Sequence, residues 1–209
     1  MNMDPISSSS NMVILRHAHT DHNGPPKRFQ GRLDVPLSEK GFAQARAEKS
    51  KYTWVKQVVA SPALRVQQTV QTLFEDRETA PPVTLDANLW EIDNGWFAGK
   101  LVDEVRQIDA AHLQTWFNTP ADINPGGGEF VLDMLIRAIC ALRKIEILGV
   151  EGTLIVTHGG IIRVLTLALN DLSLNDFHKL NVENLHALTL SVDNIAKLKF
   201  DLPPHSGDA

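Results

Sequence analysis

Two histidines in this chain directly follow short apolar runs, and an arginine precedes the first of them. The run 12–15 ends in Arg16-His17, and the run 153–157 ends in His158. Both runs have the length and the β-branched content of a buried strand. In open α/β sheets, ligands bind outside the carboxyl ends of the strands. We therefore expect Arg16, His17 and His158 to meet in one catalytic site, where imidazole could act as a nucleophile and guanidinium could bind an anion.

The segment His17 to His22 also reads H-x-H-x-D-H, a spacing typical of the zinc site in metallo-β-lactamase-fold hydrolases. Imidazole and carboxylate are suitable zinc ligands. That fold needs several strands before the motif, whereas only sixteen residues precede His17, which is about one strand's worth. The remaining metal ligands should recur downstream, but His112 and His158 lack the expected neighbours. A zinc hydrolase is therefore the weaker alternative.

The composition indicates one sizeable α/β domain. The chain has 209 residues, of which 43% are hydrophobic, and its net charge of -5 argues against a nucleic-acid partner. No apolar run is long enough to span a membrane. Cys140 is the only cysteine, which favours a reducing compartment such as the cytoplasm, and we expect its thiol to be buried and inert.

Strand and helix patterns alternate along the chain, which indicates a parallel sheet covered on both faces. We expect a single-domain three-layer α/β/α sandwich with a mostly parallel central sheet, spanning residues 12–202, between a flexible leader (1–11) and a flexible tail (203–209). Ser38 and Ser61-Pro62 have the residue types of helix starts. Strands are predicted over 12–15, 57–60, 83–85 and 153–157, with edge strands over 187–192 and 196–200. Helices are predicted over 38–52, 61–74, 101–117 (with room for a break), 129–148 and 160–169.

Five segments carry motifs that occur together in one known family. They are Arg16-His17 with Thr20 and Asn23, then 29–37 with Gly41 and Gln44-Ala45, 61–69, 89–99, and 157–160 with Arg163. In this order they resemble the motifs of the histidine phosphatase superfamily, which is phosphoglycerate-mutase-like. The resemblance covers Val13 to about Leu169. One such motif would be weak, but five in the family's order make chance agreement remote.

The resemblance implies a metal-independent phosphomonoesterase that forms a phosphohistidine. His17 would be the nucleophile, and Glu91 would donate and accept the proton. Arg16, Arg65 and a protonated His158 would bind the phosphate dianion, for which guanidinium forks are well suited. Because phosphoryl transfer depends mainly on positioning and charge stabilisation, no metal or other cofactor is required. A binding module that has lost catalysis is less expected, because all five of these residues are present.

The substrate is expected to be a small phosphorylated metabolite, and α-ribazole 5'-phosphate is one example. Asn23, Gln30, Gly31 and Gly159 would contact it. Lys27 and Arg28 are further polar candidates, and the candidate apolar walls are Trp90, Trp96, Phe97 and Trp116. A homodimer is left open.

Within the superfamily the chain resembles the phosphatase branch, that is α-ribazole-phosphate and broad-specificity phosphatases, more than the mutases. The span from Gly99 to Thr153 is compact, whereas mutases are generally longer there. Three positions depart from the family pattern. Ala18 replaces a glycine, and an alanine would be strained if this position had a positive φ. His19 replaces an acidic or amide residue, and Phe130 replaces a serine. Glu129 is either a pocket-edge residue or a carboxylate favoured by a helix start.

Overall fold

The computed structural model describes residues 11–198, and its central element is a five-stranded sheet in the order β3-β2-β4-β1-β5. The strands are β1 (Asn11–Arg16), β2 (Gln57–Ala60), β3 (Val83–Leu85), β4 (Thr153–Thr157) and β5 (Ala187–Ser191). The first four are mutually parallel, and β5 pairs antiparallel with β1. The predicted mostly parallel sheet is confirmed.

The pairing of β1 with β4 determines where the two histidines emerge. Arg16 lies opposite Thr157 in the parallel register, so His17 and His158 are the next residues along each strand. The backbone N–H of His17 donates to the carbonyl of Thr157 at 2.9 Å, which extends the ladder by one step. Every residue of β4 is buried, as expected for a central strand covered on both faces.

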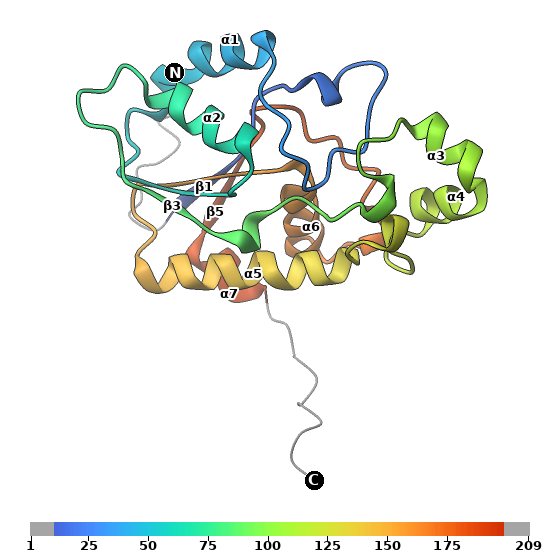
Figure 1. Cartoon of the computed structure of the whole chain (residues 1–209). Helices are drawn as coiled ribbons and strands as arrows, with labels where there is room; N and C mark the ends of the chain where they lie inside the picture. Colours follow the sequence, from blue (N-terminus) through green and yellow to red (C-terminus); the bar gives the residue numbers. More distant parts are fainter. Residues whose placement is uncertain (1–10, 199–209) are drawn as a thin grey trace, which may run out of the picture.

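Helices cover both faces of the sheet (Figure 1). α1 (Glu39–Glu48) and α2 (Leu64–Phe74) pack on one face, and α5 (Val131–Leu148), α6 (Gly159–Leu169) and α7 (Val192–Lys197) pack on the other. Successive side chains of a strand point to opposite faces, so β1 contributes to both cores. The three-layer sandwich is confirmed.

α3 (Val102–Ile108) and α4 (Ala110–Asn118) lie together at one end of the molecule (Figure 1). The predicted helix over 101–117 is therefore broken, and the break falls at Asp109. Asp109 ends α3 and caps α4, because its carboxylate accepts from the backbone N–H of His112 at 2.9 Å. Short 3₁₀ turns connect the remaining elements: Asp21–Asn23, Lys49–Tyr52, Ala87–Leu89, Gly95–Phe97, Pro125–Gly127 and Leu174–Asp176.

The second predicted edge strand, over 196–200, is wrong where the structure describes it. Ala196 and Lys197 belong to α7, and residues 199 and 200 lie outside the described residues. Ser191 and Asn194 form a capping box that begins this helix: the Ser191 hydroxyl accepts from the N–H of Asn194, and the Asn194 side chain accepts from the N–H of Ser191. This local capping outweighs the strand-like composition of the segment.

The predicted start of α2 is also wrong, because the helix begins at Leu64 rather than at Ser61-Pro62. The N–H of Leu64 is satisfied by the Asp34 carboxylate at 3.0 Å, so a distant loop supplies the side chain that a local serine was expected to supply. Ser38, by contrast, caps α1 as predicted by accepting from the N–H of Gly41. Cys140 is exposed on α5, contrary to the expectation of a buried thiol.

The expected leader and tail fall mostly outside the described residues. Asn11, assigned to the leader, is the first residue of β1. In residues 11–198, no helix is both long enough and apolar enough to cross a membrane.

Candidate active site

A cavity of about 280 Å³ opens at the carboxyl ends of β1 and β4. Of the nine residues predicted for the site, seven line it: Arg16, His17, Asn23, Gln30, Gly31, Arg65 and Glu91. Two do not, and these are His158, which lies behind His17, and Gly159. The structure thus brings together residues that are up to 75 positions apart in the sequence.

His17 is held in one orientation at the floor of the cavity and is buried. Its Nδ1 lies 2.7 Å from the carbonyl oxygen of Ala18. A carbonyl only accepts, so Nδ1 carries the proton and Nε2 has the free lone pair. Burial, and then the charges of Arg65 and Arg16, lower the pKa of His17 well below its ordinary value of 6.5. The ring is therefore neutral at neutral pH. Ala18 has no positive φ, so the alanine is not strained.

Arg16 provides an unsatisfied cationic donor beside this ring. Its Nη1 donates to the carbonyl oxygen of Val182 at 2.6 Å, which fixes the direction of the side chain. Its Nε is buried and has no hydrogen-bond partner among residues 11–198. A buried donor without a partner costs about 1–3 kcal/mol. An anion bound in the cavity would satisfy it.

Arg65 is completely buried, and its donors are used within the protein. Nη1 donates to the carbonyl of Leu33 at 2.7 Å, and Nη2 donates to the carbonyl of Gly31 at 2.8 Å. The amide oxygen of Gln30, when it faces Arg65, accepts from Nε at 2.6 Å. Burial lowers the pKa of Arg65 to about 10, so the group remains charged at neutral pH.

Gly31 is a position that only glycine fits easily. Its φ is +50°, and a Cβ there would lie 2.9 Å from Asn94 Nδ2. The sharp turn that results aims the carbonyl of Gly31 at Arg65.

His158 differs from its expected role as a protonated phosphate ligand. Its Nδ1 lies 3.0 Å from Arg65 Nη2, which can only donate, so His158 Nε2 carries the proton and donates to the Ser61 hydroxyl at 2.8 Å. Burial, and then the charges of Arg65 and His17, lower its pKa well below 6.5. His158 therefore fixes Arg65 from behind as a neutral ring. Ser61, expected as a helix cap, is its acceptor.

Glu91 reaches the start of α6 from the loop after the 3₁₀ turn Ala87–Leu89. Its Oε2 accepts from the N–H of Gly160 at 3.2 Å, and its Oε1 accepts from the N–H of Ile92 at 2.9 Å. A Cβ at residue 160 would lie 2.0 Å from Oε1, so only glycine allows this approach. The carboxylate is only partly buried and lines the cavity.

Asn23 and Arg163 complete the polar part of the lining. The side-chain oxygen of Asn23 accepts from the N–H of Thr20 and from Asn184 Nδ2, which leaves its amide nitrogen for a ligand. Arg163 donates from Nε to the carbonyl of Leu180 at 2.9 Å. The sequence motifs include Arg163, but it was not predicted as a site residue.

The apolar wall of the cavity is only partly the one predicted. Trp116 lines it as expected, whereas Trp90 is stacked on His158, Phe97 is a core residue, and Trp96 lies outside the lining. Phe29, Phe117, Phe177 and His178 line it instead. Burial lowers the pKa of His178 to about 4, so this ring is neutral too. Phe29 belongs to the motif over 29–37, but no motif distinguishes Phe117, Phe177 and His178.

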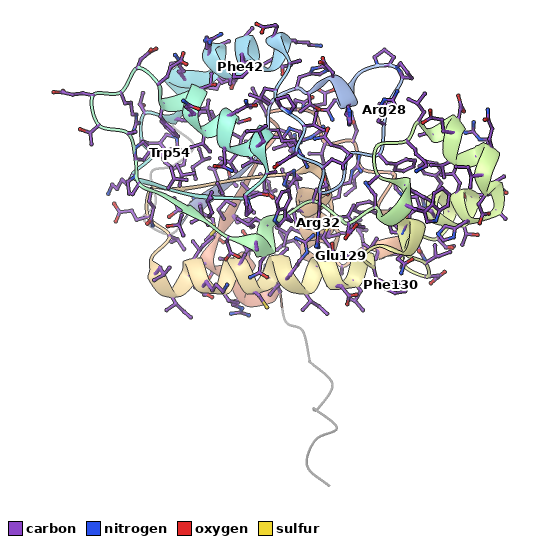
Figure 2. All side chains as sticks on the ribbon, in the orientation of Figure 1. Arg28, Arg32, Phe42, Trp54, Glu129 and Phe130 are labelled. Atoms are coloured by element: carbon purple, nitrogen blue, oxygen red, sulfur yellow. The ribbon has the colours of Figure 1, made fainter. Side chains whose placement is uncertain are left out.

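A second, strongly polar hollow of about 410 Å³ adjoins the cavity and shares Arg16 and Arg163 with it. His19 and His22 border this hollow, as do Lys27, Arg28 and Lys40. Figure 2 shows Arg28 on the loop near α3, where it lies 3.7 Å from the Glu104 carboxylate. The entrance to the site is therefore cationic, although the whole chain is acidic.

The H-x-H-x-D-H segment is not arranged as a metal centre. His17 directs Nδ1 to its neighbour's carbonyl, whereas His19 directs Nδ1 to the Ser38 hydroxyl at 2.8 Å. In the described part of the chain, no three His, Cys, Asp or Glu side chains converge closely enough to hold a metal ion.

Glu129 does not line the cavity, so it is not a pocket-edge residue. It lies at the start of α5, as in the second expectation, directly before the N-cap residue Phe130. Its carboxylate forms an ion pair with Arg137.

Comparisons with known proteins agree with this geometry. Residues 12–197 match the family model of the histidine phosphatase superfamily (branch 1). Phosphoserine phosphatase 1 of Hydrogenobacter thermophilus is 26% identical over 202 residues, covering 94% of each chain. The probable phosphoglycerate mutase GpmB of an Enterobacter species is 30% identical over 71% of this chain and 69% of that protein. The structure of Bacillus stearothermophilus YhfR superposes with a TM-score of 0.79 at 29% identity, covering 88% of this chain and 91% of the other.

The chain therefore belongs to the histidine phosphatase superfamily. Its relatives include both phosphatases and mutases, and the fold is not that of the zinc hydrolases considered from the sequence.

The buried neutral histidines predict a pH-dependent stability. Their pKa is lower in the folded protein than in the unfolded chain, so the unfolded chain binds more protons and the free energy of unfolding falls as pH drops below 6.5. Each such histidine adds a slope of about 1.4 kcal/mol per pH unit. His158→Gln keeps an acceptor for Arg65 and a donor for Ser61 but does not titrate. Between pH 7 and 5 the unfolded histidine is only partly protonated at first, so urea unfolding should give a mean slope shallower by about 1 kcal/mol per pH unit in the variant. Equal slopes would contradict a neutral His158.

Proposed function

We propose that this protein hydrolyses small phosphomonoesters through a phosphohistidine formed on His17. One observation carries the proposal: a buried, neutral imidazole with Nε2 free lies beside an arginine whose Nε is buried and unpartnered. A nucleophile must have a free lone pair, and a phosphate dianion needs a cationic donor that water does not already satisfy.

In the first step, the Nε2 lone pair of His17 attacks phosphorus and the ester P–O bond breaks. Protonated Glu91 gives its proton to the departing oxygen, so the products are phospho-His17, the free alcohol and a Glu91 carboxylate. Arg16 and the amide nitrogen of Asn23 hold the phosphoryl oxygens. Arg65 adds a fixed positive charge from behind, because its own donors are already bound by protein acceptors.

In the second step, water attacks the phosphorus and the P–N bond breaks. The Glu91 carboxylate takes a proton from this water, which regenerates the acid, and inorganic phosphate leaves. The neutral form of His17 is restored. Charge stabilisation comes from arginines throughout, so these steps require no metal.

The lining of the site favours a substrate with an apolar or aromatic body. Trp116, Phe117 and Phe177 form a wall next to the polar floor, and α-ribazole 5'-phosphate is one metabolite of this type. The cationic hollow beside Arg16 and Arg163 favours substrates that are anionic overall. The cytoplasmic location, the absence of a nucleic-acid partner and a homodimer stay predictions from the sequence.

Substituting the nucleophile should separate chemistry from binding. His17→Ala should lower turnover by at least about 10⁴-fold, because it removes the lone pair that attacks phosphorus. Calorimetric titration with inorganic phosphate should show retained binding, since Arg16 and Asn23 remain. Mass spectrometry of quenched wild-type enzyme should place the phosphoryl group on the peptide that contains His17. The matched control is His186→Ala, whose side chain is exposed. If the two variants turned over equally, His17 would not be the nucleophile.

Glu91→Gln should be selective for the leaving group. The loss of the phosphorylation rate should be about 10²–10⁴-fold on an alkyl phosphate, whose alkoxide needs a proton, and small on p-nitrophenyl phosphate, which needs none. Asp93→Asn is the matched control on the same loop, because Asp93 does not line the cavity. Rapid-quench measurements on both substrates give the two ratios. Equal losses for Glu91→Gln would show that another group is the acid.

A phosphoglycerate mutase is the second candidate, because a mutase is among the relatives. A mutase must return the phosphoryl group to its substrate before water attacks. Here the cavity is bordered by exposed Lys27 and Arg28, and the span between Gly99 and Thr153 holds only α3, α4 and α5 with one 3₁₀ turn. With 3-phosphoglycerate as substrate, we expect phosphate release to exceed formation of 2-phosphoglycerate, and the opposite ratio would identify a mutase.

A further inference from the structure

Arg137 lies on α5, outside the cavity, and three of its hydrogen bonds go to the loop that carries Glu91. Its Nη1 donates to the carbonyl oxygens of Asn88 at 2.8 Å and Trp90 at 2.6 Å, and its Nη2 donates to that of Glu91 at 3.2 Å. The side chain is only 14% exposed. One guanidinium group thus satisfies three backbone acceptors in one short loop.

Glu129 fixes the plane of this guanidinium group. Arg137 Nε donates to Glu129 Oε1 at 2.6 Å, and Nη2 donates to Oε2 at 2.8 Å, which makes a bidentate pair. Arg32 approaches the same carboxylate from outside, with Nη2 at 3.3 Å, and Figure 2 shows Arg32 and Glu129 close together beside α5. The charges of Arg137 and Glu129 balance each other, and both side chains are nearly buried.

The same carboxylate also holds the far side of the loop. The N–H of Asp93 donates to Glu129 Oε2 at 3.3 Å, and the N–H of Glu129 donates to the carbonyl of Asp93 at 2.9 Å. The segment 90–94 has no regular secondary structure, so it lacks a ladder of its own to define its course. Arg137 and Glu129 together hold the backbone on both sides of Glu91.

We propose that Arg137, paired with Glu129, is a positioning residue for proton transfer by Glu91. This inference rests on the proposed function, because the pair would hold in place Glu91, the acid of the proposed reaction. A proton donor must lie within hydrogen-bond reach of the leaving oxygen, and a displacement of 1 Å can cost about 10²-fold in rate. Lysine cannot replace the arginine, because its single nitrogen cannot bind a carboxylate bidentately and reach three carbonyls as well.

The test compares Arg137→Lys with Arg143→Lys on the same helix. Arg143 is 42% exposed, and within residues 11–198 its side chain pairs with the Glu146 carboxylate at 3.3 Å. We expect Arg137→Lys to lower the phosphorylation rate on an alkyl phosphate about 10–100-fold, with a much smaller loss on p-nitrophenyl phosphate. Affinity for inorganic phosphate should be unchanged, since Arg16 is untouched. Arg143→Lys should behave like the wild type in all three measurements.

Two outcomes would overturn the role of Arg137. One is an equal loss of phosphorylation rate on both substrates together with a lower urea midpoint of unfolding, which would indicate general structural damage. The other is no loss of rate on either substrate. Should Arg137→Lys fail to fold, Glu129→Gln tests the same pair, because it keeps the arginine and removes its counter-charge. Glu91→Gln serves as the reference. If that variant is not selective, the proposed function itself fails, whereas a selective Glu91→Gln with an unselective Arg137→Lys refutes only the positioning role.

Discussion

The site depends on the burial of positive charge around one small cavity. Arg16, Arg65 and Arg163 are each mostly or fully buried there, and burial lowers the pKa of all three. Two unit charges 4 Å apart repel by about 4 kcal/mol at an effective dielectric constant of 20. Burial first, and then the charges of these arginines, disfavour a protonated histidine here, so His17 and His158 are neutral. The same buried positive charge that would favour a bound anion thus adds to the effect of burial in keeping His17 unprotonated.

Backbone carbonyls make this accumulation tolerable. Leu33 and Gly31 accept from Arg65, Val182 accepts from Arg16, and Leu180 accepts from Arg163. Each carbonyl supplies partial negative charge without a second ionised group that would cancel the field toward the ligand. Among residues 11–198, Glu91 is the one carboxylate that lines the cavity, and its charge raises the pKa of Arg16 and Arg163 against the effect of burial.

Much of this arrangement could be predicted from the sequence, and the reason is local. The strands before His17 and His158 are continuous apolar runs that include β-branched residues, so the pattern predicts both strands and the histidines at their ends. The parallel register of the structure then places these ends together. The family motifs added Arg65 and Glu91.

What could not be predicted depends on contacts between distant segments. Asp34 caps α2 in place of Ser61, and His158 donates to Ser61 rather than to the ligand. The aromatic wall around His178 has no periodic signal, and the capping box at Ser191 was hidden in a strand-like composition.

Residues near the start of the fold depend for several hydrogen bonds on one segment that is synthesised late. Val182 accepts from Arg16, and Asn184 donates to the carbonyl of His17 and to the side chain of Asn23. Arg16, His17 and Asn23 are among the first residues of the fold to leave the ribosome, whereas Val182 and Asn184 are among the last. A nascent chain that ends before residue 182 contains both histidines, both strands and Glu91, but its Arg16 side chain lacks the Val182 carbonyl and its His17 backbone lacks the hydrogen bond from Asn184. The hydrogen-bond set around Arg16, His17 and Asn23 is therefore complete only once this late segment has been synthesised.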